Sequence, residues 1–203
     1  MRYIGIEGPC LAGKTTLGTA LLDDLRKGLA VDVVEDYADF VGGGAKMPAE
    51  APASVEGELE ALAELLDVEE RRFAHVDADS EYTLIDRTCL TLVGHAYGMD
   101  EYFGRRDFGS IVSETVSADA RSRIPDVIVY LDIDMATQTR RNKGKFPVGS
   151  IFIDPEFNRG FRSYFLDTAN EFAIPVLHLD GRVSPLSILG QTRAYLDGWM
   201  DAP

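Results

Sequence analysis

The chain of 203 residues has little positive charge, two cysteines and no long apolar run. Cys10 and Cys89 are too few for a disulfide scaffold and lack the spacing of metal ligands. Without a long apolar run the sequence predicts no membrane span, and its first residues show no signal-peptide pattern. We therefore expect a soluble cytoplasmic protein whose two thiols stay reduced.

Positive charge is scarce, because 20 Lys and Arg stand against 34 Asp and Glu, for a formal net charge of −14. This balance disfavours a nucleic-acid groove or an anionic membrane as the partner. Hydrophobic residues make up 45% of the chain, enough for one sizeable core. No linker interrupts the sequence, so we predict a single domain over residues 1–203.

A glycine-containing loop is the most informative segment. It has the Walker A spacing, a glycine, four residues and then Gly-Lys-Thr, between a short apolar strand at residues 3–7 and a helix with Leu17, Leu21 and Leu25 on one face. Backbone N–H groups of such a loop bind phosphate oxygens, while Lys14 would reach the β and γ phosphates and the Thr15 hydroxyl would bind Mg²⁺. The predicted nucleotide-binding residues are Gly8, Pro9, Cys10, Leu11, Ala12, Gly13, Lys14, Thr15 and Thr16.

The second predicted strand, residues 31–34, ends in two acids, Glu35 and Asp36. In open α/β sheets the ligand crevice lies outside the carboxyl ends of the strands. Both acids are therefore candidates for the acceptor site, with simple solvation of a strand end as the alternative.

A third predicted strand, residues 82–87, closes with Asp86 and Arg87. An aspartate at this place can hold the shell of Mg²⁺, as a Walker B acid does. Arg87 beside it would bridge the transferring phosphoryl group and the acceptor.

A helix is predicted over residues 56–75, where Leu59, Leu62, Ala63 and Leu66 form one apolar stripe. Continued, the stripe reaches Glu70, whose carboxylate would need Arg71, Arg72 or a ligand as its partner. The alternative is that Asp67 and Arg71 pair in solvent, with Glu70 at the margin of the core.

Two segments are candidate covers for a site. Residues 42–57, rich in Gly, Ala, Pro and Glu, are expected to form a mobile surface loop. Residues 140–153 begin with four cations within six residues, Arg140, Arg141, Lys143 and Lys145. We predict a basic lid in which Arg140 and Arg141 meet transition-state charge, and a solvated basic loop is the alternative.

Strands and helices alternate along the whole chain, which predicts a parallel doubly wound α/β sheet. The remaining predicted strands are residues 125–132, apolar enough to be buried on both faces, and 174–180. The remaining predicted helices are residues 88–98, 107–123, 135–141, one beginning at Pro155 behind the N-cap Asp154, and 185–200.

Together these motifs resemble the thymidylate kinase and deoxynucleoside kinase group of P-loop kinases. The resemblance is carried, in the order typical of the family, by residues 6–17, Asp86-Arg87-Thr88, residues 130–133 and the basic segment 140–145. It implies a P-loop kinase fold, a five-stranded parallel sheet with helices on both faces and a basic lid. It also implies ATP and Mg²⁺ as cofactors and transfer of the γ-phosphoryl group to a nucleoside-like small-molecule acceptor, and it leaves a homodimer open.

Carried over by position, the resemblance implies that Lys14 and Thr15 bind ATP and Mg²⁺ and that Arg87 contacts the acceptor. Arg71 aligns with an arginine of thymidylate kinases that contacts the acceptor base. Asp67 stands where those enzymes tend to carry an aromatic residue that stacks on the base, which puts recognition of thymine in doubt.

The acids after the second strand separate the alternatives. Thymidylate kinases commonly present an arginine to the acceptor phosphate there, whereas nucleoside kinases place a glutamate as general base. A hydroxyl acceptor has to lose a proton and benefits from a carboxylate, whereas a phosphate acceptor needs cations. The sequence therefore favours a hydroxyl acceptor, with Glu35 as the preferred base and Asp36 as its alternative. A nucleoside monophosphate kinase is the runner-up.

A regulatory P-loop NTPase is the alternative from a different class. Such proteins usually select guanine with an Asn-Lys-x-Asp segment. Residues 142–145, Asn-Lys-Gly-Lys, lack the acid, which disfavours this reading.

Overall fold

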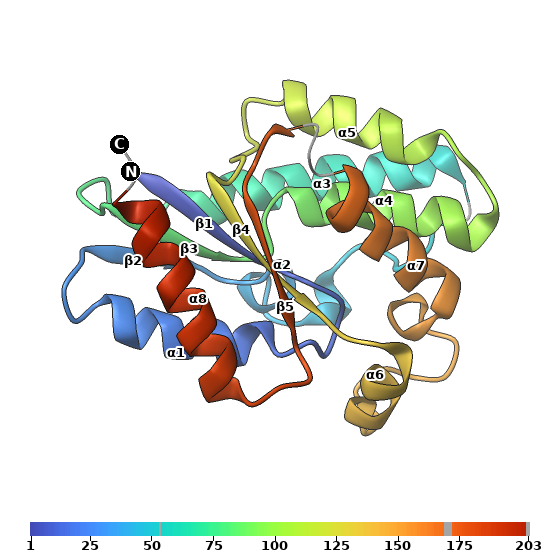
Figure 1. Ribbon diagram of the computed structural model, residues 1–203. Coiled ribbons are helices and arrows are strands. Elements are labelled where there is room, and N and C mark those ends of the chain that lie inside the picture. The colour runs from blue at the N-terminus through green and yellow to red at the C-terminus, as the bar shows by residue number, and fades with distance from the viewer. Residues whose placement is uncertain (53, 169–171, 202–203) are drawn as a thin grey trace.

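The computed structural model describes residues 1–52, 54–168 and 172–201. Five parallel strands form one sheet in the order β2-β3-β1-β4-β5, as Figure 1 shows. The strands are β1 (Arg2–Glu7), β2 (Val31–Val34), β3 (Tyr82–Asp86), β4 (Val127–Asp132) and β5 (Val176–Asp180). The predicted α/β class with a five-stranded parallel sheet is confirmed.

Helices cover both faces of the sheet (Figure 1). Helices α1 (Lys14–Leu25) and α8 (Pro185–Met200) pack with one face, and α3 (Val55–Phe73), α4 (Leu90–Phe103), α5 (Phe108–Ala118) and α7 (Pro155–Ser163) contribute to the core on the other. The shorter elements are α2 (Tyr37–Phe40), α6 (Met135–Asn142), 3₁₀ turns at Gly44–Lys46 and Ile151–Ile153, and a π-helical turn at Tyr164–Thr168.

Strand β4 explains how one sheet supports two cores. Its side chains alternate, so that Val127, Val129 and Leu131 lie in the core under α1 and α8. Ile128 and Tyr130 lie in the core on the opposite face. All five are fully buried, as their near-continuous apolar run predicts.

Helix α4 extends beyond its predicted end at Gly98 and stops at Phe103, followed by Gly104 in a left-handed conformation. Gly98 does not end the helix because it serves close packing instead. A Cβ on Gly98 would come within 2.7 Å of the Phe157 ring on α7. Helix α5, in contrast, ends at Ala118, short of the predicted residue 123, since Asp119 takes an extended conformation.

Helix α3, Val55–Phe73, begins one residue before and ends two residues before its predicted bounds of 56–75, but its buried face is shifted from the predicted one. The stripe through Leu59, Ala63 and Glu70 is wrong, because these three side chains are exposed. The buried residues are Glu58, Leu62, Leu66, Val68, Glu69 and Arg72. An apolar pattern cannot reveal this face, because three of its members are charged and are buried with ion-pair partners.

Both cysteines are free thiols. Across the described ranges, no helix is long and apolar enough to cross a membrane.

Candidate active site

The glycine loop joins β1 to α1 at the carboxyl edge of the sheet. Gly8 has φ 140°, and a Cβ there would lie 2.3 Å from the Leu131 carbonyl oxygen on the neighbouring strand β4. Only glycine fits this close approach. Gly13, with φ 105°, then turns the chain into α1. The loop backbone and the helix N-terminus thereby meet in an arrangement that suits a phosphate.

Lys14 is folded over this loop. Its Nζ donates to the carbonyl oxygens of Gly8 and Pro9, each at 3.1 Å, and the residue is 7% exposed. Burial lowers the pKa of Lys14, and the positive charge of Arg87 lowers it further. Bound phosphates would relieve both effects, because they bring negative charge to a desolvated ammonium.

The structure brings together Thr15 and Asp86, the two predicted metal ligands. The Thr15 hydroxyl donates to Asp86 Oδ2 at 3.0 Å, and the buried Oδ1 of Asp86 accepts no hydrogen bond from any described residue. Burial raises the pKa of Asp86, although Lys14 opposes the shift. A hydroxyl and an unsatisfied carboxylate oxygen fit Mg²⁺, which takes most of its ligands from phosphates and water. Among the described residues, no group of three or more His, Cys, Asp or Glu could hold a metal.

Asp36 and Arg87 are brought together from two strand ends. Asp36 Oδ2 lies 2.9 Å from Arg87 Nε, and Asp36 Oδ1 accepts the Ala38 N–H as N-cap of α2. Burial alone would raise the pKa of Asp36, but the Arg87 guanidinium, the hydrogen bond from Ala38 N–H and the charges of Lys14 and Arg72 together lower it. Arg87 has φ 65°, an unusual conformation for a non-glycine residue, and its Nη2 also reaches Cys10 Sγ at 3.3 Å.

Glu35 does not share this position. Its side chain is exposed and does not line the cavity described below, while its carbonyl oxygen accepts from Arg72 Nε at 2.8 Å. Of the two acids after β2, the structure therefore places only Asp36 toward the glycine loop.

Arg72 clamps the two strand ends that carry Asp36 and Arg87. Besides the Glu35 carbonyl, it donates to the carbonyl oxygens of Asp86 and Arg87, at 3.0 and 2.9 Å. Its Nη1 pairs with Glu69 at 2.7 Å, and both side chains are completely buried. No pattern in the sequence favours Arg72 over Arg71, yet it is Arg72 that makes these contacts.

The other predicted acceptor residues on α3 lie outside the site. Glu70 and Arg71 are exposed, and Arg71 Nε donates only to the Asp67 carbonyl at 3.3 Å. The Asp67 carboxylate is also exposed and pairs with Arg121 at 2.5 Å. The structure does not bring these three residues to the glycine loop, because they lie on the solvent face of the helix.

The basic segment lies beside the loop. Arg141 Nη1 donates to the carbonyl oxygens of Leu11 and Ala12, each at 3.1 Å, and its Nη2 to Gly181 at 2.8 Å. Arg140 is exposed, with one contact at 3.3 Å to the Thr137 hydroxyl. Neither arginine lines the cavity, whereas Lys145 does.

One large cavity, of about 720 Å³, runs from the glycine loop between α3, α4, α5 and α7. Lys14, Thr15, Asp36 and Arg87 lie on its wall. The predicted cover 42–57, of which Ala53 lies outside the described residues, contributes Met47 and Glu50. The apolar walls are formed by Leu62, Leu65, Leu92, Ala96, Phe108, Val112, Phe152, Phe157 and Phe161.

Three groups on or near this cavity escaped the sequence analysis. Glu7 is fully buried and accepts from the Thr88 and Thr91 hydroxyls at 2.8 and 2.7 Å. His95 lies edge-on to Phe157, and burial lowers its pKa to about 4. Glu58 lines the cavity although it is 5% exposed. No local spacing marks these residues, since their partners come from distant segments.

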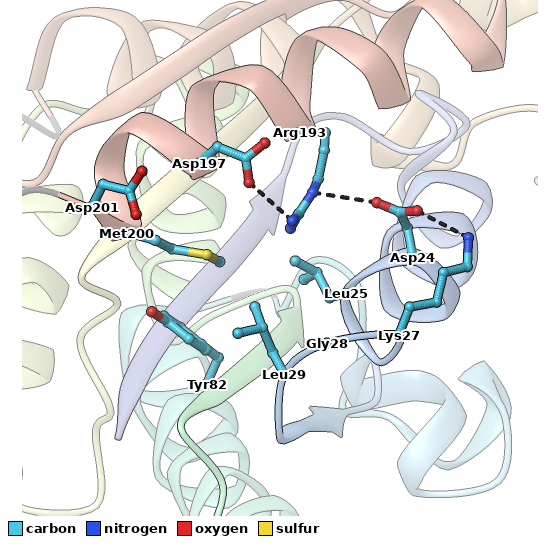
Figure 2. Close-up of a pocket in the computed structure, with 10 residues that line it drawn as sticks. All are labelled: Asp24, Leu25, Lys27, Gly28, Leu29, Tyr82, Arg193, Asp197, Met200 and Asp201. Carbon is cyan, nitrogen blue, oxygen red and sulfur yellow. Dashed lines mark hydrogen bonds and ion pairs between the residues drawn. The ribbon is translucent and has the colours of Figure 1, made fainter.

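A second cavity, of about 570 Å³, lies at the opposite edge of the sheet, where β3 begins (Figure 2). Arg193 crosses it between Asp24 and Asp197, at 3.3 and 3.0 Å. It shares no lining residue with the larger cavity. We assign it no part in the chemistry, because ligands of open α/β sheets bind at the carboxyl ends of the strands.

Comparison with known proteins agrees with this fold and layout. Three solved structures of deoxyadenosine kinase from M. mycoides align over nearly the whole of both chains. The structure with bound dATP matches with a TM-score of 0.70 and 13% identity, covering 96% of this chain and 99% of that one. The structure with the products dCMP and dCDP gives 0.68, and the one with dCTP 0.65, both at 13% identity, with 97% of this chain covered.

The fold is therefore that of the P-loop deoxynucleoside kinases, as the motifs predict. At this identity the likeness establishes the fold alone. No family model and no curated protein matches the sequence.

Proposed function

We propose that this chain transfers the γ-phosphoryl group of ATP, with Mg²⁺, to a hydroxyl group of a nucleoside or a similar small molecule. Lys14 and the loop backbone hold the phosphates, and Thr15 with Asp86 holds the metal, which neutralises charge on the phosphates when bound. Arg87 lies between the loop and the acceptor side. The neighbours with bound dATP, dCTP and dCMP support nucleotides and nucleosides as the ligand class.

The proposal of a hydroxyl acceptor rests on the position of Asp36. Its carboxylate lies in the same cavity as Lys14 and is held by Arg87, where it can accept the proton of an attacking hydroxyl. The cavity walls also favour a neutral acceptor. Among described lining residues the cations are Lys14, Arg87 and Lys145, against the acids Asp36, Asp39, Glu50 and Glu58.

A screen of acceptors tests the proposal. Purified protein with ATP and Mg²⁺ would be given ribo- and deoxynucleosides, each beside its 5′-monophosphate, and ADP and the phosphorylated product would be measured. We expect nucleosides to react and the matched monophosphates to react at least tenfold more slowly. A preference for monophosphates would show the runner-up, a nucleoside monophosphate kinase, to be correct. ADP formation independent of any acceptor would indicate an NTPase.

The cover and the lid belong to the same proposal. Residues 42–57 and 140–153 contact each other, since Ser150 Oγ donates to Glu50 Oε2 at 2.9 Å. Both would enclose the acceptor and exclude water during transfer.

A further inference from the structure

Leu11, in the middle of the glycine loop, has an unusual backbone conformation. Its φ is 68°, in the left-handed region that a non-glycine residue rarely adopts. Such a conformation persists only where the surrounding structure holds it in place. In return, it allows neighbouring N–H groups to converge on one point, which suits an anion. The contacts that hold the peptide groups on either side of Leu11 therefore matter for phosphate binding.

Both of these peptide groups are held by side chains of α6. Gln138 Nε2 donates to the carbonyl oxygen of Cys10, before Leu11, at 3.1 Å. Arg141 Nη1 donates to the carbonyl oxygen of Leu11 itself, also at 3.1 Å. Gln138 and Arg141 are three residues apart, so they lie on one face of the helix and reach consecutive peptide groups.

The contact from Gln138 sets the direction of the Leu11 N–H. In a trans peptide the C=O and N–H bonds point in opposite directions, so a Cys10 carbonyl bonded to α6 turns the Leu11 N–H away from this helix. That side is the large cavity, since Cys10 and Leu11 line it and Gln138 does not. Among the described residues the Leu11 N–H donates to no backbone carbonyl, so a phosphate oxygen can accept it.

Gln138 is almost completely buried, and its Nε2 has three acceptors within reach. Besides the Cys10 carbonyl these are the Phe152 carbonyl at 2.8 Å and Asn158 Oδ1 at 3.3 Å. The Phe152 carbonyl also accepts from Asn158 Nδ2 at 3.1 Å, so it keeps a donor when Gln138 is changed. The Cys10 carbonyl, in contrast, has Gln138 as its one donor within the described ranges. Loss of the Gln138 amide would therefore affect the glycine loop most.

We propose that Gln138 is a positioning residue, which holds the Cys10–Leu11 peptide in the orientation that binds the phosphates of ATP. This inference rests on the proposed function, because it assumes that ATP occupies the glycine loop. Gln138 itself touches no substrate and acts through the backbone of the loop. Without its hydrogen bond the loop populates conformations that do not bind ATP, and the apparent affinity falls with the fraction that remains competent.

The test measures the Kd of ATP with Mg²⁺ by calorimetry, so it needs no acceptor. Gln138→Met keeps the length of the side chain but removes both amide N–H groups. We expect the Kd to rise about three- to tenfold, the range of one hydrogen bond in a buried site. Thr139→Ala is the matched control, since Thr139 is exposed on the same helix, and it should keep the wild-type Kd.

A second background separates positioning from a general loss of stability. Glycine adopts a positive φ without steric cost, so the loop of a Leu11→Gly variant depends less on being held from outside. In this background Gln138→Met should change the Kd of ATP by less than about twofold. A merely structural role of Gln138 would lower the melting temperature and change the Kd by the same factor in both backgrounds.

An unchanged Kd in Gln138→Met would overturn the inference, as would an equal loss of affinity in both backgrounds. Hydrogen exchange of the wild-type protein decides the matter if the variants do not fold. ATP should slow the exchange of the Leu11 N–H by about tenfold or more, and an unprotected Leu11 N–H in the ATP complex would also overturn the inference. Failure of the wild-type protein to bind ATP would instead overturn the proposed function, on which the inference rests.

Discussion

Replacing Asp36 by asparagine should remove the general base while leaving the local structure in place. The asparagine oxygen can still accept the Ala38 N–H, which Asp36 Oδ1 accepts at 2.9 Å, so the N-cap of α2 is kept. The variant loses the negative charge that faces Arg87 and the capacity to take a proton. Asp36→Asn therefore separates basicity from shape.

The expected loss follows from the chemistry of the step. General-base catalysis contributes about two to four powers of ten in rate, which corresponds to roughly 3–5 kcal/mol of barrier. Loss of the ion pair with Arg87 should also destabilise the fold, because the two side chains are only 13% and 22% exposed and Arg87 keeps its charge without a partner at this position. Stability therefore has to be measured beside turnover, so that the kinetic loss is read only from folded protein.

The assay is steady-state turnover of a nucleoside found in the acceptor screen, with ATP affinity and thermal unfolding measured beside it. Asp36→Asn should lower kcat by about 10²- to 10⁴-fold with ATP affinity nearly unchanged. Glu35→Gln is the matched control and should be nearly silent, because the Glu35 side chain is exposed and Arg72 binds only its carbonyl group.

The pH profile gives a second readout. The pKa of Asp36 is lowered from its ordinary value of 3.8, chiefly through Arg87 acting against burial, so the carboxylate stays ionised at all higher pH. Wild-type kcat should therefore show no loss from protonation of Asp36 above about pH 5. An Asp36→Asn variant that retains a third of the wild-type kcat would refute the assignment. So would a Glu35→Gln variant that loses as much as Asp36→Asn.

Three further predictions concern other groups. Lys14→Ala should lower kcat/KM at least 100-fold while far-UV circular dichroism stays native, and near-normal turnover would contradict the nucleotide site. Arg141→Ala should weaken ATP binding and lower the melting temperature, because Arg141 donates hydrogen bonds to two carbonyl groups of the glycine loop. Arg140→Ala is the control and should leave the melting temperature unchanged. Equal changes in melting temperature for the two variants would show that Arg141 does not support the loop. Burial lowers the pKa of His95 from 6.5 to about 4, so on acidification the unfolded chain takes up a proton at this residue before the folded chain does. The free energy of unfolding should therefore fall by about 3 kcal/mol between pH 6.5 and 4 because of His95. Chemical denaturation of wild type and His95→Phe over this pH range would measure the effect, and the same pH dependence of the free energy of unfolding in both proteins would contradict it.

The elements predicted well are those with a strong local signal. The Walker A spacing with its flanks defined the glycine loop, and the apolar run from Val127 to Leu131 defined the central strand, because burial on both faces requires such a run. The aspartate N-cap and Pro155 located the start of α7. In each case neighbouring residues carry the information.

The site was predicted less completely because its contacts are long-range. On α3 the sequence favoured Glu70 and Arg71, whereas the buried ion pair is Glu69 and Arg72. The hydrogen-bond partners of this pair are Tyr37 and the ends of strands that are distant in sequence. The hydroxyl of Tyr37 donates to Glu69 at 2.7 Å, a contact that no periodicity could indicate.

The sequence favoured Glu35 as the base, whereas the structure places Asp36 in the cavity, for a related reason. Alternation along a strand predicts that one of two neighbours faces the crevice, but β2 ends at Val34 and Asp36 is already the cap of the next helix. The direction of its side chain is set by the turn and by Arg87, and the strand pattern does not extend to it.

Helix α3 joins the strand ends to the far part of the large cavity. Its buried Arg72 is bonded to the strand ends, and Glu58, which lines the cavity, lies fourteen residues and about 21 Å earlier along the helix axis. The extent of the cavity along this wall is therefore set by the number of residues in one helix. Four residues inserted between Leu62 and Glu69 would move Glu58 about 6 Å away from the strand ends with little rotation, and the cavity would become longer by that amount.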